Sequence, residues 1–155
     1  MTAEMEPQAK SLSDKVRGAM LRVKRLLFVD DDKILAEFFE KFARTEFLAD
    51  IVAVNRTLDA INLLERGEQF DVAVLDLRVL NGSGVDLYRN MRARWPRVEV
   101  VFLTGYGTDE ARKEIEAIGP ARIYSKEAVY RLVFLRQLMV ALGFRPRDGM
   151  HGAGI

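Results

Sequence analysis

The sequence predicts an α/β domain built on a doubly wound, five-stranded parallel sheet, and three observations lead to this class. Short apolar runs rich in Val, Leu, Ile and Phe alternate along the chain with longer segments that have apolar residues at helical spacing. The runs are continuously apolar, which is typical of strands buried on both faces of a parallel sheet. Each run is followed by a helical segment, so helices would connect neighbouring parallel strands and cover both faces of the sheet.

Five such strand–helix pairs account for the central part of the chain. The strands are expected at residues 26–29, 50–54, 71–76, 98–103 and 121–125. The helices are expected at residues 34–47, 57–67, 84–95, 109–119 and 127–144. Gly67, Gly119 and Gly143 each follow a helical pattern, at the position where a left-handed residue commonly ends a helix.

The 155 residues are enough for one globular domain with a real core. We place this domain at residues 25–144. Residues 1–24 would be an N-terminal extension that is disordered or forms a short helix over 11–24. Residues 145–155 are rich in Gly and are expected to be a flexible tail, and no output domain is visible in the sequence.

The composition excludes several classes of chemistry. The chain has no cysteine, so it has no disulfide, no thiolate metal site and no Cys nucleophile. Its only histidine, His151, lies in the Gly-rich tail, which argues against a Ser–His–Asp triad and a histidine metal cluster. No apolar run reaches transmembrane length and the first ten residues are not those of a secretory signal, so we expect a cytoplasmic protein.

An acidic triplet follows the first predicted strand, in the stretch LLFVDDDK. Asp32 directly precedes a helical pattern and suits the N-cap position. Capping requires only one Asp, and the negative charges of Asp30 and Asp31 repel each other unless a positive group lies between them. A cation would therefore account for the crowding.

Other polar side chains stand at the ends of neighbouring strands. Asp76 ends the third predicted strand, Thr104 the fourth and Lys126 the fifth. In open α/β sheets, ligands bind outside the carboxyl ends of the strands, near the point where the strand order reverses. Each residue alone suits an ordinary turn or surface position, but their joint occurrence at one rim indicates a site.

These segments resemble a known family, the receiver domain of two-component response regulators, in particular the chemotaxis-type single-domain receivers with their flavodoxin-like fold. The resemblance rests on LLFVDDD, DVAVLDLRVLNGSGVDL, VVFLTGYGT and RIYSK in this order, and it covers residues 25 to about 142. It implies that Asp76 accepts a phosphoryl group from a phosphohistidine donor and becomes an aspartyl phosphate.

The resemblance also implies a cofactor and partners. Mg²⁺ would be bound by Asp30, Asp31, Asp76 and the backbone carbonyl of Arg78. Thr104 and Lys126 would contact the phosphoryl oxygens. The donor would be a sensor histidine kinase or a phosphotransfer protein, and the chain would be a self-phosphorylating acceptor rather than a turnover enzyme. Its signal would be an altered interaction with a downstream protein, without nucleic acid or membrane.

Three positions depart from the usual pattern of the family. Receivers commonly carry proline where this chain has Leu80 and Glu127, and an aromatic residue where it has Ile123. These departures leave a second interpretation open: a pseudo-receiver that binds proteins or dimerises without phosphorylation. A third is a small-molecule enzyme of the same fold or an Asp-dependent phosphatase, but the loop after the first strand is acidic where phosphate binding favours Gly.

The last predicted helix, 127–144, is unusually apolar, with 13 apolar residues among 18. A helix packed on one face of a sheet needs an apolar stripe of only about 100°. Either the helix is deeply buried or it presents an apolar surface to another protein. We expect a dimer or partner interface on this helix.

Overall fold

The computed structural model describes residues 22–79, 82–105 and 109–147. A six-stranded sheet in the order β7-β6-β3-β1-β2-β8 forms the centre of the domain. Its strands are β1 (Lys24–Val29), β2 (Phe47–Val54), β3 (Val72–Asp76), β6 (Glu99–Thr104), β7 (Arg122–Ser125) and β8 (Arg145–Pro146). The first five are parallel, and the order reverses between β1 and β3, so their carboxyl ends flank the switch point at which α/β sheets bind ligands.

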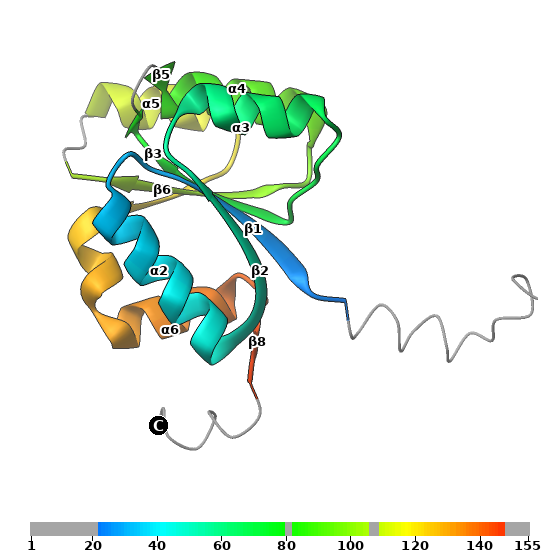
Figure 1. The fold of residues 1–155 in the computed structure, drawn as a ribbon. Helices are drawn as coiled ribbons and strands as arrows, with labels where there is room; N and C mark the ends of the chain where they lie inside the picture. Colours follow the sequence, from blue (N-terminus) through cyan, green and yellow to red (C-terminus); the bar gives the residue numbers. More distant parts are fainter. Residues whose placement is uncertain (1–21, 80–81, 106–108, 148–155) are drawn as a thin grey trace, which may run out of the picture.

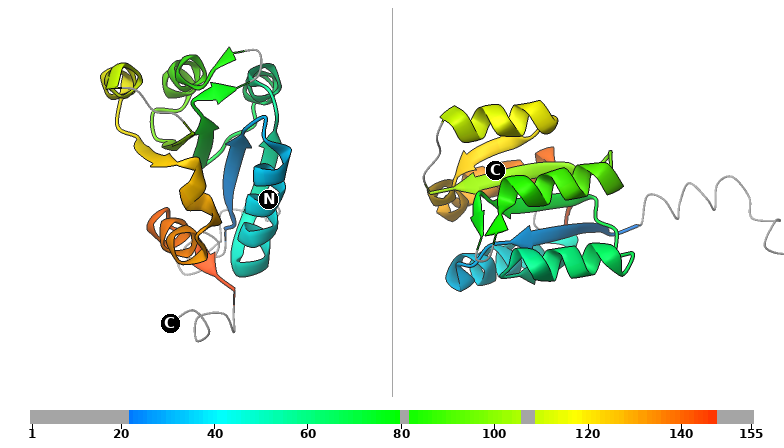
Figure 2. Two further views of the ribbon diagram at one scale, coloured as in Figure 1. Left: turned by 90° about the vertical axis from the view of Figure 1, so that its left-hand side faces the viewer. Right: turned by 90° about the horizontal axis from the view of Figure 1, so that it is seen from above.

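Helices cover both faces of the sheet, as the end-on view in Figure 2 shows. α2 (Lys33–Glu46) and α6 (Leu132–Ala141) lie on one face, and α3 (Thr57–Glu65), α4 (Gly84–Arg94) and α5 (Asp109–Ile118) lie on the other. The predicted doubly wound α/β class is therefore confirmed. Within the described residues, no helix is long and apolar enough to cross a membrane.

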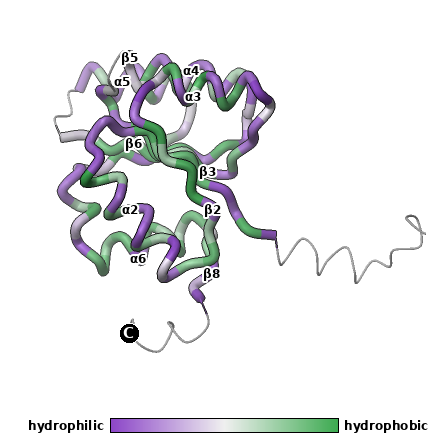
Figure 3. Tube along the Cα trace, in the orientation of Figure 1, coloured by the Kyte–Doolittle hydropathy of each residue, from purple (hydrophilic) through white to green (hydrophobic). Residues whose placement is uncertain are grey.

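Alternation along the buried strands creates two cores. Leu26 and Phe28 of β1 pack under α2 and α6, whereas Leu27 and Val29 pack under α3, α4 and α5. Every residue of β3 is buried, as expected for a central strand covered on both sides. Figure 3 shows the central strands as mostly hydrophobic, α2 to α5 as alternating hydrophobic and hydrophilic residues, and α6 as largely hydrophobic.

The strand β8 was not predicted and corrects the boundary of the C-terminal tail. Arg145 and Pro146 pair antiparallel with the start of β2, although residues 145–155 were expected to be flexible. Arg147 continues the attachment: its backbone N–H donates to the carbonyl of Glu46 at 2.9 Å, and its Nε donates to the carbonyl of Arg44 at 2.7 Å. Such long-range pairing leaves no periodic signal in a two-residue segment.

The last helix is shorter than predicted and is interrupted. A 3₁₀ turn, η3 (Lys126–Tyr130), precedes α6, and Arg131 between them has the extended backbone angles φ −90° and ψ 106°. The predicted single helix 127–144 is wrong at this point because the extended backbone of Arg131 breaks the helical hydrogen bonding. α6 buries Leu135, Leu138 and Met139 and leaves an apolar outer side exposed.

Two of the three glycines predicted to end helices adopt the left-handed backbone conformation. Gly67 and Gly143 have φ of +87° and +89°, as the predicted C-terminal positions require. Gly119 does not adopt the left-handed conformation, because the residue before a proline is driven towards extended backbone and Pro120 follows it.

At the N-terminus, the predicted helix over 11–24 lies almost wholly outside the described residues. Its last residue, Lys24, already belongs to β1, so the first strand starts one residue before the predicted domain.

Candidate functional site

Three carboxylates meet at the carboxyl ends of β1 and β3. Ligand oxygens of Asp30, Asp31 and Asp76 all lie within 4.8 Å of one another. Asp30 and Asp76 are buried, whereas Asp31 is exposed at the rim. The arrangement is the one that the ends of two neighbouring parallel strands predict, because β1 and β3 are paired directly.

The loop after β1 holds Asp30 in place. Its Oδ1 accepts a hydrogen bond of 2.8 Å from the backbone N–H of Asp32. Asp32 in turn caps α2, since its side chain accepts from the backbone N–H of Leu35 at 3.1 Å. The predicted capping role of Asp32 is confirmed, and the cap separates it from the two carboxylates that face the site.

Burial makes the charge on Asp30 costly. Desolvation, partly offset by the hydrogen bond from Asp32, raises the pKa of Asp30 to about 6, and the charge of Asp76 adds to the increase. The second oxygen, Oδ2, is buried and has no hydrogen-bond partner among the described residues. A buried carboxylate oxygen without a partner is uncommon in folded proteins, and a bound ion or water would satisfy it.

Lys126 compensates part of this negative charge. Its Nζ donates to Asp76 Oδ2 at 2.9 Å and to Asp30 Oδ1 at 3.1 Å. Burial alone would lower the pKa of Lys126, but its hydrogen bonds and the charges of the two carboxylates outweigh burial and raise the pKa. The ammonium group thus bridges both buried carboxylates and stays protonated.

A residue that the sequence analysis missed positions Lys126. The Ser125 hydroxyl accepts from the backbone N–H of Glu127 at 3.2 Å and caps η3, so the turn starts at the lysine. The signal available in the sequence was a Ser, a common N-cap residue, directly before the lysine that ends the predicted strand. Lys126 therefore reaches the carboxylates with Glu127, rather than proline, as the next residue.

Thr104 ends β6 at the same rim. In the strand register Asp76 pairs with Leu103, and Thr104 pairs with Ser125 of β7. A hollow of about 110 Å³ lies beside Thr104 and is lined further by Leu77, Ile115 and Ile123. Ile123 therefore faces α5 beside an open volume.

Tyr124 points to the opposite face of the sheet and packs on Phe134, with ring centroids 5.0 Å apart. Since neighbouring residues of a strand point to opposite faces, Tyr124 cannot replace an aromatic residue at Ile123.

The segment after Asp76 folds back as a small hairpin of β4 (Arg78–Val79) and β5 (Gly82–Ser83). The backbone N–H of Arg78 donates to Asp76 Oδ1 at 3.2 Å. The Arg78 side chain is exposed. The hairpin therefore brings the backbone of Arg78 next to the carboxylate. Leu80 lies outside the described residues.

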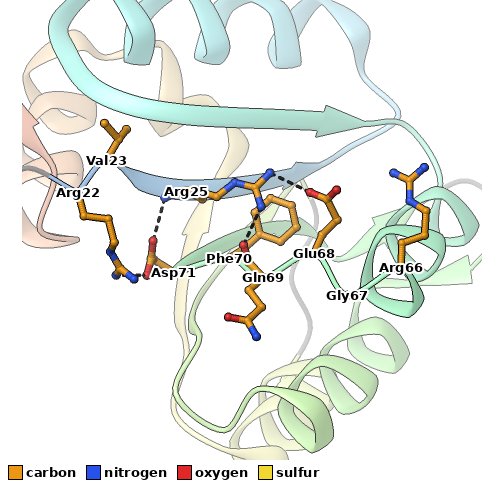
Figure 4. A pocket seen from close by; sticks show the side chains of 9 residues that line it. All are labelled: Arg22, Val23, Arg25, Arg66, Gly67, Glu68, Gln69, Phe70 and Asp71. Atoms are coloured by element: carbon orange, nitrogen blue, oxygen red, sulfur yellow. Dashed lines mark hydrogen bonds and ion pairs between the residues drawn. The ribbon is translucent and has the colours of Figure 1, made fainter. Parts of the chain in front are cut away.

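A separate hollow of about 520 Å³ lies at the opposite end of the strands, around the start of β1 (Figure 4). There Arg22 pairs with Asp71, and Arg25 pairs with Asp50 and Glu68, each at 2.8–2.9 Å. The Arg25 guanidinium also lies 4.6 Å from the ring centroid of Phe70, which in turn contacts Trp95. Since these guanidinium groups are paired with carboxylates, the network holds the strand starts together.

Comparisons with known proteins agree with this site and fold. The family model of the response regulator receiver domain matches residues 26–132. The chain is 32% identical over 94 residues to response regulator protein PilR of Pseudomonas aeruginosa, covering 60% of this chain and 21% of PilR. It is 32% identical over 107 residues to photosynthetic apparatus regulatory protein RegA of Rhodovulum sulfidophilum, covering 66% of this chain and 55% of RegA. The chain thus spans only part of these relatives.

Among solved structures, a CheY-like response regulator receiver domain protein from Methanospirillum hungatei superposes with a TM-score of 0.70 at 20% identity. The match covers 78% of this chain and 94% of that one, and at this identity it supports the fold. Together with the family match over most of the described residues, the fold and the carboxylate rim lead to one conclusion: this chain belongs to the response regulator receiver domains of two-component systems.

Proposed function

We propose that Asp76 is the phospho-acceptor of a two-component or phosphorelay pathway and receives its phosphoryl group from a phosphohistidine. The observation that carries the proposal is the bridge from Lys126 to both Asp30 and Asp76, beside a buried oxygen that has no partner. In the transfer, a carboxylate oxygen of Asp76 forms a bond to phosphorus while the bond from phosphorus to the imidazole nitrogen breaks. The imidazole leaves and the acyl phosphate remains on the chain.

The carboxylate cluster fits a magnesium ion. Three carboxylates within 4.8 Å offer the hard oxygen ligands that Mg²⁺ prefers, and Asp30 Oδ2 is available for such a ligand. We propose Asp30, Asp31, Asp76 and the backbone carbonyl of Arg78 as its ligands. When bound, the ion would neutralise the carboxylates and the charge on the transferring oxygens.

Lys126 and Thr104 would orient the phosphoryl group and stabilise its charge. Lys126 is held by Asp30 and Asp76 where a phosphoryl oxygen on Asp76 would lie, and its positive charge favours that anion. Thr104 stands at the neighbouring strand end, and its hydroxyl would donate to another phosphoryl oxygen. The hollow beneath Thr104 leaves room for the end of β6 to move inward, which would change the surface that other proteins contact.

The pseudo-receiver remains the competing proposal, because Leu80 and Glu127 replace the usual prolines. The intact contacts of Lys126 argue for a working acceptor. We further propose that the domain acts by itself, through altered protein–protein contacts in the cytoplasm.

Asp76→Ala should abolish phosphorylation. Incubation of the wild-type chain with a small phosphodonor and Mg²⁺ should add one phosphoryl group in intact-protein mass spectrometry. The gain should disappear in Asp76→Ala and in the presence of a chelator, because both the acceptor oxygen and the metal are needed. Asp86→Ala, an exposed carboxylate on α4, is the matched control and should phosphorylate normally. A wild-type chain that binds Mg²⁺ but gains no mass from any phosphodonor would favour the pseudo-receiver.

We propose that the donor protein docks beside the rim on an apolar face formed by Ile34, Tyr130, Leu132 and Val133. Ile34 and Val133 are 74% and 68% exposed, which is unusual for aliphatic side chains. The ring centroids of Phe38 and Tyr130 lie 5.1 Å apart, so Phe38 joins the α2 part of this face to the η3 part. Ile34 follows the acidic loop and Tyr130 follows Lys126 by four residues, so the face borders the acceptor.

Val133→Lys should slow transfer from a phosphohistidine-carrying protein by about tenfold, equivalent to about 1.4 kcal/mol, because it places a charge in an apolar contact. Phosphorylation by a small phosphodonor should stay unchanged, which separates docking from chemistry. Leu58→Lys on α3, 54% exposed, is the control and should transfer normally. A dimer in sedimentation velocity that Val133→Lys dissociates, with normal transfer, would assign the face to self-association instead.

A further inference from the structure

We infer that the end of the domain opposite the acceptor carries a binding site for a small organic anion, a compact apolar body bearing one carboxylate or phosphate group. The site is a hollow of about 550 Å³ between the end of α4, the loop into β6 and the loop into β7. This volume is within the range of small-molecule sites, about 300–1,000 Å³. Neither phosphorylation nor the family assignment is needed for this inference.

The charges that line the hollow are unbalanced. Arg92, Arg97 and Arg122 face it, and Glu99 is the single carboxylate among its lining residues. Glu99 lies 3.4 Å from Arg122, so it compensates that arginine alone. The C-terminus of α4 contributes only about half a negative charge. A net positive charge remains for a ligand to neutralise.

Arg92 is held rigidly by neutral groups. Its guanidinium donates to the carbonyls of Pro96 and Pro120 and to the hydroxyl of Tyr88, and it lies 5.1 Å from the Tyr88 ring centroid. None of these acceptors carries a negative charge, so the arginine is positioned without being neutralised. A fixed guanidinium recognises carboxylate or phosphate at a smaller entropic cost than a mobile one.

Arg97 contributes a further positive charge to the hollow. It is exposed in the loop between α4 and β6, and within the described part of the chain its side chain forms no ion pair. The hollow at the start of β1 shows the contrast, since its arginines Arg22 and Arg25 already bind Asp71, Asp50 and Glu68. The lining of the first hollow has three arginines and two carboxylates, with Arg66 as its third arginine, whereas the lining of the hollow beside Arg97 has three arginines and one carboxylate, so the latter has the larger excess of positive charge.

The walls favour an apolar ligand body. Pro120 and Ala121 present apolar surface beside the guanidinium groups, and the buried side chains of Val98 and Val100 lie beneath them, 3% and 1% exposed. A site of this kind binds an anion with an apolar group more tightly than a bare ion, because burying apolar surface adds to the charge interaction.

The test is a titration of the full-length chain at low ionic strength, followed by amide NMR shifts. Benzoate and phenyl phosphate are the two probes, and they distinguish a carboxylate site from a phosphate site. Either should saturate and shift amides around Val98 and Ala121, whereas uncharged benzamide and inorganic phosphate should bind at least about fivefold more weakly. Absence of saturable binding of both probes at tens of millimolar would overturn the inference, and so would equal binding of benzamide.

Arg97→Ala should weaken the better probe by about fivefold or more, because it removes one guanidinium without touching the core. Arg66→Ala, which removes an exposed arginine lining the other hollow, is the matched control and should bind as the wild type does. Equal weakening in the two variants would show that the probe senses only overall charge, and would refute a site at Arg97.

Discussion

Asp30→Asn should make the metal-free protein more stable while it weakens Mg²⁺ binding. The pKa of Asp30 is raised to about 6, so the folded environment favours the neutral carboxyl even with Lys126 beside it. An increase of about two pKa units corresponds to about 3 kcal/mol at pH above 7, and an amide of the same shape would recover much of this. Asn retains an oxygen that accepts from Lys126 and from the backbone of Asp32.

The gain in unfolding free energy of Asp30→Asn should increase with pH. Since the folded pKa is higher than the unfolded one, the ionised carboxylate costs stability fully above about pH 6 and costs nothing below about pH 4. In urea unfolding with chelator, the difference in unfolding free energy between variant and wild type should therefore be largest near pH 8 and fade as the pH falls to 4.

A matched variant and a metal titration complete this experiment. Asp31→Asn removes an exposed charge and should change stability by no more than about 0.5 kcal/mol. Both variants should bind Mg²⁺ more weakly, by more than about tenfold for Asp30→Asn. A loss of stability in metal-free Asp30→Asn at pH 8 would contradict the conclusion that this buried charge is a cost.

Gly84→Ala should be strongly destabilising. A Cβ at this position would overlap the carbonyl oxygen of Asp76 and lie 3.1 Å and 3.2 Å from the Asp76 carbonyl carbon and the Leu77 Cα. These obstacles are backbone atoms, and the backbone N–H of Gly84 is itself bonded to the Leu77 carbonyl at 3.1 Å. The variant must therefore displace α4 from the end of β3, at a cost of about 3 kcal/mol or more.

Urea unfolding measures this cost, and phosphorylation by a small phosphodonor should slow in parallel because Asp76 moves. Gly105→Ala is the matched control, since a Cβ there meets nothing within 4 Å. Its unfolding free energy should stay within about 1 kcal/mol of wild type. Equal stability of Gly84→Ala and Gly105→Ala would contradict the close approach of α4 to Asp76.

Much of this architecture could be predicted because its causes are local. Continuous apolar runs predicted the five parallel strands, and their ends predicted that Asp30, Asp76 and Lys126 would meet. The order of strands then placed β1 beside β3, which a sequence pattern does not show by itself. The resemblance to receivers supplied the roles of the residues, and these remain proposals.

The errors have non-local causes. β8 exists only because Arg145 and Pro146 pair with the start of β2, about a hundred residues earlier, and Arg147 binds the end of α2. The interruption at Arg131 lies inside an apolar pattern that fits one continuous helix. In both places tertiary contacts overrule the local preference of the chain.

The ion pairs around Arg25 bear on how the domain accommodates the repulsion among the carboxylates at the other end of the sheet. At that end of the strands, the starts of β1, β2 and β3 are joined by matched charges, and local preferences agree with the fold. At the other end, three carboxylates share one lysine, so the native contacts there compete with one another. In the language of folding landscapes, the carboxylate rim is locally frustrated, whereas the ion pairs around Arg25 support one another. The stable end can hold the sheet together while the rim stays poised to rearrange when its charge changes.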